Sequence, residues 1–399
     1  MRGCFASRVV DKAMARQTGA MSQQRIPAAF IRGGTSKGVF FHRRDLPDDR
    51  DAWDRIFLDV IGAPDPHRRQ LNGMGGGISS LNKVMVVAPS NRDDADVDYT
   101  FAQIAADQPI VDYSSNCGNL SSAIGPFAID EGLIAVDDGD TLVRLYNTNT
   151  RKIVHALIPV ADGKTETNGA FELQGVAGTG AKLQLDYLDP GGAGTGRLLP
   201  TGQVAEELEV AGDGTYAVSL VDAATPMVFV GAAALGMTAT EDPAALDADK
   251  KLKDRLEGLR RAGAVRMGLV NRPEDTSLAS PRLAILAAPT AFTSLAGETV
   301  GADIQDITVR VISAGDTHRA SPLTSAMCLG AACQIKGTLP HQLARANKGD
   351  VRIGNPSGVL TVGADVVHDN TGWRAISTRS YRTQRRLMEG MVLIPEAAG

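Results

Sequence analysis

The chain has 399 residues, of which 43% are hydrophobic and 22% are charged, and its formal net charge is −5. This length exceeds what one hydrophobic core usually organises, so we expect two domains. The acidic balance argues against a general nucleic-acid binder, which needs basic surfaces to neutralise phosphates. No run of about 20 apolar residues is present, so we expect no contact with a membrane.

Strands, glycine turns and one amphipathic helix are predicted for the first third of the chain. Residues 51–62 carry apolar side chains at helical spacing, whereas residues 120–131 are apolar on every side and predict a buried helix. Bulky apolar runs bounded by Gly or Asp predict strands. These strands cover residues 26–32, 38–42, 83–88 and 98–104.

The remainder of the chain repeats this order of elements. Residues 189–196 are rich in Gly and predict an irregular linker between two halves. Predicted strands lie at 142–146, 153–160, 171–173, 182–187, 216–221, 227–230, 283–287 and 307–312. A polar helix is expected at 246–262 and a second apolar helix at 321–333. Each half therefore reads as strands around one apolar helix, an α+β arrangement with a weak internal duplication.

Cysteine and histidine patterns exclude several kinds of site. Cys4, Cys117, Cys328 and Cys333 form no CxxC pair, and the six histidines form no metal-binding motif. We therefore expect a reduced, cytoplasmic protein without disulfides, metal or cofactor. Residues 1–21 lack the apolar core of a secretory signal, and either a disordered tail or a start codon placed before the true start at Met21 would explain them.

Cys117 is the first candidate for the active site. It lies in Asn116-Cys117-Gly118-Asn119, directly before the apolar helix, where unpaired backbone N–H groups favour a thiolate or an anionic ligand. The alternative is that Asn116 caps the helix and Cys117 is a buried packing residue. Glycine-rich stretches at 32–38 and 73–83 favour one shared pocket.

Together, these features resemble the PrpF family of the diaminopimelate epimerase-like fold. The resemblance runs from about Arg25 to the C-terminus. The segments that carry it are IRGGTSKGVFF (31–41), GAPDP (62–66), NGMGG (72–76), Lys83, Asp98-Tyr99, NCGN (116–119), PTG (200–202), RMGL (266–269), PSG (356–358) and MEG (388–390).

The resemblance implies two pseudo-symmetric domains, 22–196 and 197–399, each a strongly curved sheet or barrel around a central helix. The last strand is expected to return to the first domain or to stay in the second. Lys83 and Cys117 would face a substrate between the domains. Further residues expected around the ligand are Arg32, Thr35, Ser36, Lys37, Ser79, Ser80, Gly118, Asn119, Ser321, Thr324, Ser357 and Gly358.

The family's reactions need a base and a sink for negative charge. From composition alone Lys83 would be an exposed lysine, but the resemblance makes it the base that removes an allylic proton. Backbone N–H groups near 117–119 and 321–324 would stabilise the resulting dienolate. Cys117 either returns the proton or shapes the pocket. Lys37 either holds a substrate carboxylate or is solvated.

Several functions remain open at this stage. The leading one is cis-trans isomerisation of 2-methylaconitate; 4-oxalomesaconate tautomerisation and a methylitaconate-type Δ-isomerisation follow. A racemase is disfavoured because the second helix opens with no cysteine, and Cys328 and Cys333 lie deeper in it. A binding protein that captures tricarboxylates without turnover is the alternative from another class. The substrate would be a small di- or tricarboxylate, and the sequence leaves a homodimer open.

Overall fold

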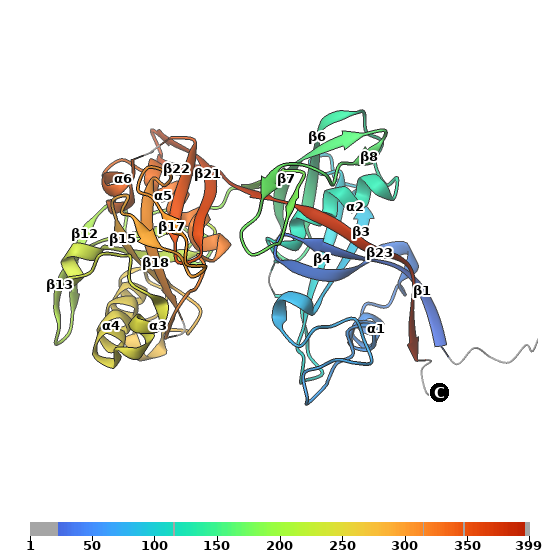
Figure 1. The fold of residues 1–399 in the computed structure, drawn as a ribbon, viewed down its shortest axis with the longest axis horizontal. Coiled ribbons are helices and arrows are strands. Elements are labelled where there is room, and N and C mark those ends of the chain that lie inside the picture. Colours follow the sequence, from blue (N-terminus) through green and yellow to red (C-terminus); the bar gives the residue numbers. More distant parts are fainter. Residues whose placement is uncertain (1–22, 115, 314, 346–347, 396–399) are drawn as a thin grey trace, which may run out of the picture.

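A computed structural model describes residues 23–114, 116–313, 315–345 and 348–395. The predicted N-terminal tail, with Cys4, lies outside these residues. Figure 1 shows two lobes side by side, one with α1 and α2 and the other with α3 to α6. None of the helices in the described ranges is long and apolar enough to cross a membrane.

The first lobe is a curved sheet whose strands follow one another in space as β1, β2, β3, β4, β6, β7 and β11. Side chains alternate between its two faces, as in any strand: Ala29 and Ile31 pack toward α2, while Ile26 and Ala28 pack toward α1. The bounds are β1 Gln23–Gly33, β2 Ser36–His42, α1 Asp51–Ile61, β3 Lys83–Pro89, β4 Val97–Ile104, α2 Ile124–Asp130, β6 Gly139–Asn147, β7 Lys152–Ala161 and β11 Leu183–Leu188.

The predicted apolar helix at 120–131 is confirmed, although its first turn is tighter than expected. Leu120–Ala123 form a 3₁₀ turn, η3, that continues as α2. Every residue from Leu120 to Ile129 is buried, because no side of this segment is polar. The sheet wraps around it, which places the amino end of the helix in the interior.

The second lobe repeats the strand pairing of the first. Along β1, β2, β3, β4, β6, β7 and β11, neighbouring strands pair antiparallel, parallel, antiparallel, parallel, antiparallel and antiparallel. Along β13, β14, β15, β18, β20, β21 and β22 the same order recurs. The central helix here is α5, Leu323–Gln334, which is buried from Ser325 to Cys333. The internal duplication predicted from the sequence is therefore present in the topology.

The bounds in the second lobe are β12 Glu206–Val210, β13 Gly214–Asp222, β14 Pro226–Gly231, α3 Pro243–Ala248, α4 Lys250–Arg266, β15 Arg282–Ala287, β18 Ile307–Ser313, α6 Leu339–Leu343, β20 Asp350–Asn355, β21 Gly358–Asp369 and β22 Gly372–Arg382. The short elements are η1 Arg43–Asp45, η2 Ser79–Leu81, β5 Val111–Asp112, β8 Lys164–Thr165, β9 Phe171–Glu172, β10 Thr179–Gly180, η4 Ala232–Leu235, η5 Pro273–Asp275, β16 Phe292–Thr293, β17 Thr299–Val300 and β19 Asp316–Thr317.

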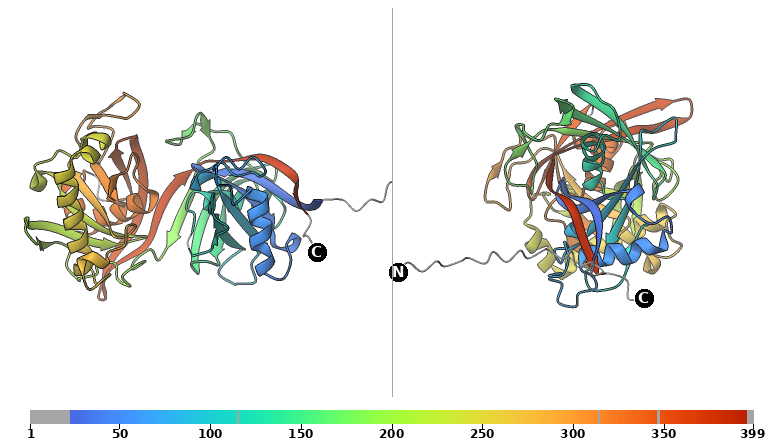
Figure 2. Two further views of the ribbon diagram at one scale, coloured as in Figure 1. Left: turned by 90° about the horizontal axis from the view of Figure 1, so that it is seen from below. Right: turned by 90° about the vertical axis from the view of Figure 1, so that its right-hand side faces the viewer.

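Two predictions about the second half were incomplete. The polar helix expected at 246–262 is two helices, because Asp249 is extended and caps α4 by accepting a hydrogen bond from Leu252 N. The strands after residue 350 were not predicted individually. The last of them, β23 (Gln384–Pro395), pairs with β1, so it does return to the first lobe. Figure 2 shows the red end of the chain passing from one lobe to the other and then lying along the blue β1, where β23 pairs.

The segment 189–196 is irregular, as predicted, but it is not a free hinge. Asp222 Oδ2 accepts hydrogen bonds from Gly194 N at 2.8 Å and Thr195 N at 2.7 Å. The lobes are also joined by β22, which pairs with both β21 and β11. Two core clusters use residues 26–185 with Val392 and Ile394, and the other two use residues 198–375. On this basis we propose a domain division near residue 196, with β23 in the first domain.

Candidate active site

Cys117 lies at the amino end of the central helix of the first lobe. Its side chain is 7% exposed and packs with the core around α2. The Sγ atom accepts a hydrogen bond from Leu120 N at 3.4 Å, and Ser121 Oγ donates to the Cys117 carbonyl at 3.0 Å. The sulfur therefore faces a backbone N–H at the start of the helix, and the reactive role of Cys117 stays a prediction.

Two buried tyrosines hold the loop that carries Cys117. Tyr99 O–H lies 3.2 Å from Asn116 Oδ1 and 3.1 Å from Ser121 Oγ, and burial raises the pKa of Tyr99 to about 12. Tyr187 O–H donates to the Gly118 carbonyl at 2.9 Å. These bonds fix the loop through its carbonyl and amide oxygens. Among the described residues, the N–H groups of Gly118 and Asn119 have no acceptor, so they are available to a ligand.

Lys83 begins β3 on the face of the sheet that packs against α2. Met85 and Val87, two and four residues later, belong to the core around α2, so Lys83 shares their direction. The lysine is 8% exposed, and its Nζ donates to Gln103 Oε1 at 2.6 Å. Nζ also lies 5.1 Å from the centre of the Phe101 ring. The expectation of a lysine enclosed in a pocket fits this position better than that of a solvated one.

The glycine turn between β1 and β2 packs directly on the Cys117 loop. Gly34 has φ +53°, and a Cβ there would overlap Asn119 Oδ1 and lie 3.1 Å from Arg382 Cδ. Arg32 closes the turn by donating to the carbonyls of Gly34 at 2.9 Å and Thr383 at 3.0 Å. Burial, followed by the charge of Arg385, lowers the pKa of Arg32.

Arg382 is a site residue that sequence reasoning missed. It lies at the end of β22, is 4% exposed, and donates to Asn119 Oδ1 at 3.2 Å and to the Tyr381 carbonyl at 2.7 Å. Burial lowers the pKa of its guanidinium. Nothing in the local sequence distinguishes this arginine from its neighbours. Only the return of β22 to pair with β11 brings it beside the Cys117 loop.

The amino end of α5 carries a second arginine that the sequence did not reveal. Arg282 Nη1 donates to Thr324 Oγ1 and Ser325 Oγ, both at 2.9 Å, and burial lowers the pKa of the guanidinium. The helix has no side-chain cap, since Pro322 occupies the N-cap position. Within the described ranges, the buried Ser321 Oγ has no hydrogen-bond partner. This helix start therefore offers unpaired donors to a ligand.

The two helix starts face each other across a cavity of about 380 Å³ between the lobes. Asn116 and Gly118 line it on one side, and Leu323 and Thr324 line it on the other. A Cβ on Gly118 would lie 3.0 Å from Leu323 Cδ2, so the lobes touch here. The volume is in the range of small-molecule sites.

Four cations have only neutral hydrogen-bond partners; Arg382 and Arg282 lie beside the two helix starts, and none of the four lines the cavity itself. Arg32 bonds to carbonyls, Lys83 to a carboxamide, Arg382 to a carboxamide and a carbonyl, and Arg282 to hydroxyls. None of them takes part in an ion pair within the part of the chain that the structure describes. Buried charges are normally paired, so this cluster is incomplete without an anion.

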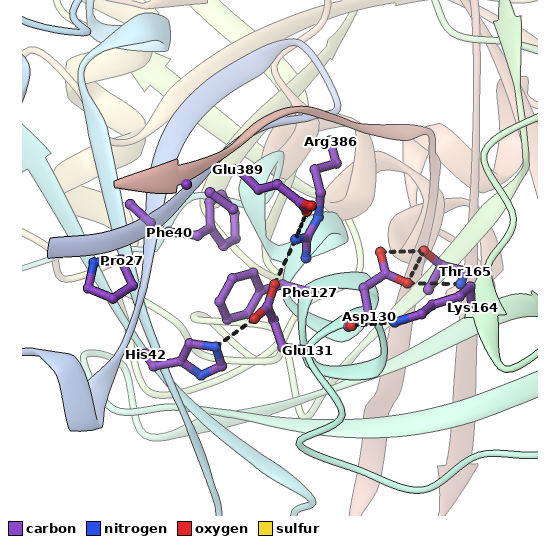
Figure 3. A pocket seen from close by; sticks show the side chains of 13 residues that line it. Pro27, Phe40, His42, Phe127, Asp130, Glu131, Lys164, Thr165, Arg386 and Glu389 are labelled. Atoms are coloured by element: carbon purple, nitrogen blue, oxygen red, sulfur yellow. Dashed lines mark hydrogen bonds and ion pairs between the residues drawn. The ribbon is translucent and has the colours of Figure 1, made fainter. Parts of the chain in front are cut away.

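A larger cavity, of about 660 Å³, lies at the opposite end of α2, and its charged residues, in contrast, form ion pairs. Figure 3 shows Glu131 bridging His42 at 2.9 Å and Arg386 at 2.6 Å, with Glu389 also bonded to Arg386 at 2.7 Å. Burial raises the pKa of Glu131, but the bonds from His42 and Arg386 outweigh it and hold the pKa below its usual range. The charged groups of this larger cavity pair with one another, so we place the candidate site at the amino end of α2, beside Cys117.

The remaining residues of the first lobe that were predicted around the ligand are only partly brought together. Lys37 lies on the opposite face of β2 from Lys83, with its Nζ 5.5 Å from the centre of the Phe30 ring. Side chains alternate along a strand, and Val39 and Phe41 of β2 face α1, so this position favours the solvated alternative; a contact between Lys37 and the substrate stays a prediction. Ser36 is buried in the turn and Thr35 is exposed at its tip.

Ser79 and Ser80 belong to η2, directly before Lys83. The Ser79 carbonyl accepts a hydrogen bond from Gln103 Nε2 at 3.1 Å, which connects it to Lys83 through one side chain. In the second lobe, Ser357 Oγ donates to the Arg319 carbonyl at 2.7 Å. Gly358 has φ +127°, and a Cβ there would lie 2.8 Å from Gln174 Nε2 of the first lobe.

A metal site is not formed by the described residues, where no three His, Cys, Asp or Glu side chains gather suitably. Cys328 and Cys333 are fully buried in the core around α5, and burial raises the pKa of both thiols. Their position fits the packing role expected for them. The absence of a cofactor stays a prediction.

Comparison with known proteins gives matches over nearly the whole chain. The family model described as "PrpF protein" matches residues 23–395. A 2-methyl-aconitate isomerase of Shewanella oneidensis is 38% identical, covering 94% of this chain and 98% of the relative. A 4-oxalomesaconate tautomerase of Pseudomonas putida is 37% identical, covering 94% and 97%. The crystal structure of a methylitaconate-delta-isomerase matches with a TM-score of 0.88 at 36% identity, covering 94% of this chain and 97% of that one.

Proposed function

The chain belongs to the PrpF family, as its motifs indicated, and we propose that it is a cofactor-independent isomerase of small unsaturated di- or tricarboxylates. The leading reaction is cis-trans isomerisation of 2-methylaconitate. The α+β epimerase-like fold expected from the sequence is confirmed by the match to the methylitaconate-delta-isomerase structure. Relatives named for three different substrates share similar identity with this chain, so experiment has to separate these substrates.

One observation carries the proposal: Arg382 and Arg282, which have no anionic partners in the described ranges, lie beside the two helix starts that border the interlobe cavity. A substrate with two or three carboxylates would supply the missing charges. Arg382 and the N–H groups of Gly118 and Asn119 would hold one carboxylate at the first helix start. Arg282, Ser321 and Thr324 would hold another at the start of α5. An acidic protein can thus bind an acidic substrate.

Lys83 is the proposed base. Its neutral amine would take the allylic proton from carbon, and the electron pair of that C–H bond would spread into the neighbouring carboxylate as a dienolate. Its Nζ is bonded to a neutral carboxamide and, among the described residues, forms no ion pair with a carboxylate. General-base catalysis by a positioned side chain contributes roughly 10²- to 10⁴-fold.

Cys117 has one of two roles in this scheme. As an acid it would return the proton to carbon, with its thiolate stabilised by the Leu120 N–H. As part of the pocket wall it would only shape the cavity. For a cis-trans isomerisation the proton returns to its original carbon after rotation, and for an allylic shift it returns to the far carbon. Both outcomes use the same base.

The test is to incubate the purified protein with cis-2-methylaconitate and, separately, with 4-oxalomesaconate in deuterated water, following both by proton NMR. We expect deuterium incorporation and the geometric isomer of the first. Turnover of the second alone would make the protein a tautomerase. Turnover of neither, with thermal stabilisation by tricarboxylates that survives Lys83→Ala, would make it a binding protein. The homodimer stays a prediction for sedimentation analysis.

A further inference from the structure

Gln103 is fixed against Lys83 by three hydrogen bonds. The two residues are opposite each other in the β3–β4 register. Gln103 Oε1 accepts from Lys83 Nζ at 2.6 Å, while Nε2 donates to the carbonyls of Asn82 at 2.8 Å and Ser79 at 3.1 Å. Because Nε2 faces two carbonyls, the carboxamide has one favourable orientation, with its oxygen toward the lysine.

Lys83 Nζ contacts both the Gln103 oxygen and the Phe101 ring, and the ring favours the ammonium. Titratable and charged groups on the elements packed around Lys83 include Asp98 and Tyr99 on β4, Cys117 before η3, Arg32 on β1, Arg382 on β22, Lys37 on β2, and Asp112 on β5. Asp112 on β5 pairs with Gln103 on β4, and hydrogen bonds from Ser114 lower the pKa of Asp112. No ion pair joins a carboxylate to Lys83 in the described ranges.

We propose that Gln103 is a positioning residue that aims the Lys83 amine without placing a negative charge beside it; this rests on the proposed function. A carboxamide oxygen accepts an N–H from either the amine or the ammonium, so it orients Nζ throughout the cycle. A carboxylate at this position would stabilise the ammonium and hold the proton on nitrogen. A neutral carboxamide at position 103 therefore suits this role better than a carboxylate does.

The decisive variant is Gln103→Glu, which has nearly the same shape but adds a negative charge next to Nζ. The rising limb of kcat/KM against pH should move upward by about 1 pH unit or more. Activity at pH 7 should fall at least ~10-fold and recover as pH rises. Gln342→Glu is the matched control: it makes the same charge change at an exposed glutamine bonded to the Gly337 carbonyl, and it should leave the profile unchanged.

Gln103→Leu separates aiming from charge. It removes the acceptor without adding an anion, so kcat should fall with no upward shift of the rising limb. A purely structural role for Gln103 would instead lower the melting temperature of both variants and leave the pH profile of the remaining activity unchanged. That result, or a Gln103→Glu profile that superimposes on the wild-type profile, would overturn the proposal.

A second readout needs no substrate. Lys83 can be titrated by NMR in protein with ¹³C,¹⁵N-labelled lysine, with its signal assigned by its loss in Lys83→Arg. The titration midpoint should rise in Gln103→Glu and stay in place in Gln342→Glu. An unchanged midpoint in Gln103→Glu would refute the role of Gln103 even if the enzyme is active. If the wild type turns over neither substrate, the proposed function is refuted, and the titration still tests the role of Gln103.

Discussion

Arg382→Met should make the protein less active without making it less stable. The guanidinium is 4% exposed and bonds only to neutral oxygens, and burial lowers its pKa. A buried charge without a counter-charge costs stability, and the fold retains it here at the amino end of the central helix. If a substrate carboxylate is the missing partner of Arg382, removing the charge should weaken substrate binding without lowering the free energy of unfolding.

The magnitudes follow from the contacts. Losing the bonds to Asn119 Oδ1 and the Tyr381 carbonyl costs roughly 1–3 kcal/mol. Removing the buried charge gains several kcal/mol, so the free energy of unfolding should stay constant or rise by up to ~2 kcal/mol. A charge-assisted bond to substrate is worth about 1.5–3 kcal/mol, so kcat/KM should fall roughly 10- to 150-fold.

The assay pairs urea unfolding with steady-state kinetics, and Arg352→Met serves as the control. Arg352 Nη2 bonds to Asp306 Oδ1 at 2.8 Å, and Asp306 is 3% exposed. Losing Arg352 leaves that carboxylate uncompensated, so stability should fall by about 2 kcal/mol, less than for a fully buried pair because Arg352 is 41% exposed. If Arg382→Met unfolds as easily as this control, or keeps full kcat/KM, the reasoning fails.

Three further predictions concern the site and its support. Lys83→Ala should lower kcat at least ~100-fold and Cys117→Ala about 10-fold or less, because removing a proton from carbon is the harder step; equal losses in single-turnover experiments would contradict this ranking. Gly34→Ala should lower the melting temperature and raise KM, whereas Gly212→Ala, at φ +77° in open space, should lower only the melting temperature. Burial raises the pKa of Asp306, but the hydrogen bonds and charge of Arg352 outweigh burial and lower it, so this stabilisation is present above about pH 4 and is lost in acid. In urea titrations from pH 3 to 7, the stability that Arg352→Met loses relative to the wild type should be largest near pH 7 and should shrink toward pH 3.

The elements around the two apolar helices could be predicted from the sequence, because an all-apolar helix and alternating strands leave direct signals. The break at Asp249 could not, since a capping side chain inside a polar run looks like one more surface residue. The pairing of β22 with β11 and of β23 with β1 was also beyond local patterns. Those contacts join residues about 200 and 360 positions apart, and register at that distance is set by the whole fold.

The site could be predicted only where a motif marks the backbone. The Cys117 loop and Lys83 could be proposed, because glycines and small polar residues mark tight turns at a helix start and before a strand. The role of Lys37 could not be decided from its motif, which says nothing about the face of β2 that it occupies. Arg282 and Arg382 were missed because a single arginine at a strand end has no local signature.

The missed residues explain how the found ones act together. A helix start offers partial charge and a thiol offers a proton, but neither fixes a substrate with several carboxylates. Arg382 on the first side and Arg282 on the second add full charges whose bonds to neutral oxygens leave their charge uncompensated. Lys83 has a carboxamide partner and, in the described part of the chain, no ion pair, so we propose that substrate carboxylates supply the charges that the two arginines lack. On this view the charge that orients the substrate is also the charge that stabilises its dienolate, and neutralising either arginine should lower kcat as well as raise KM.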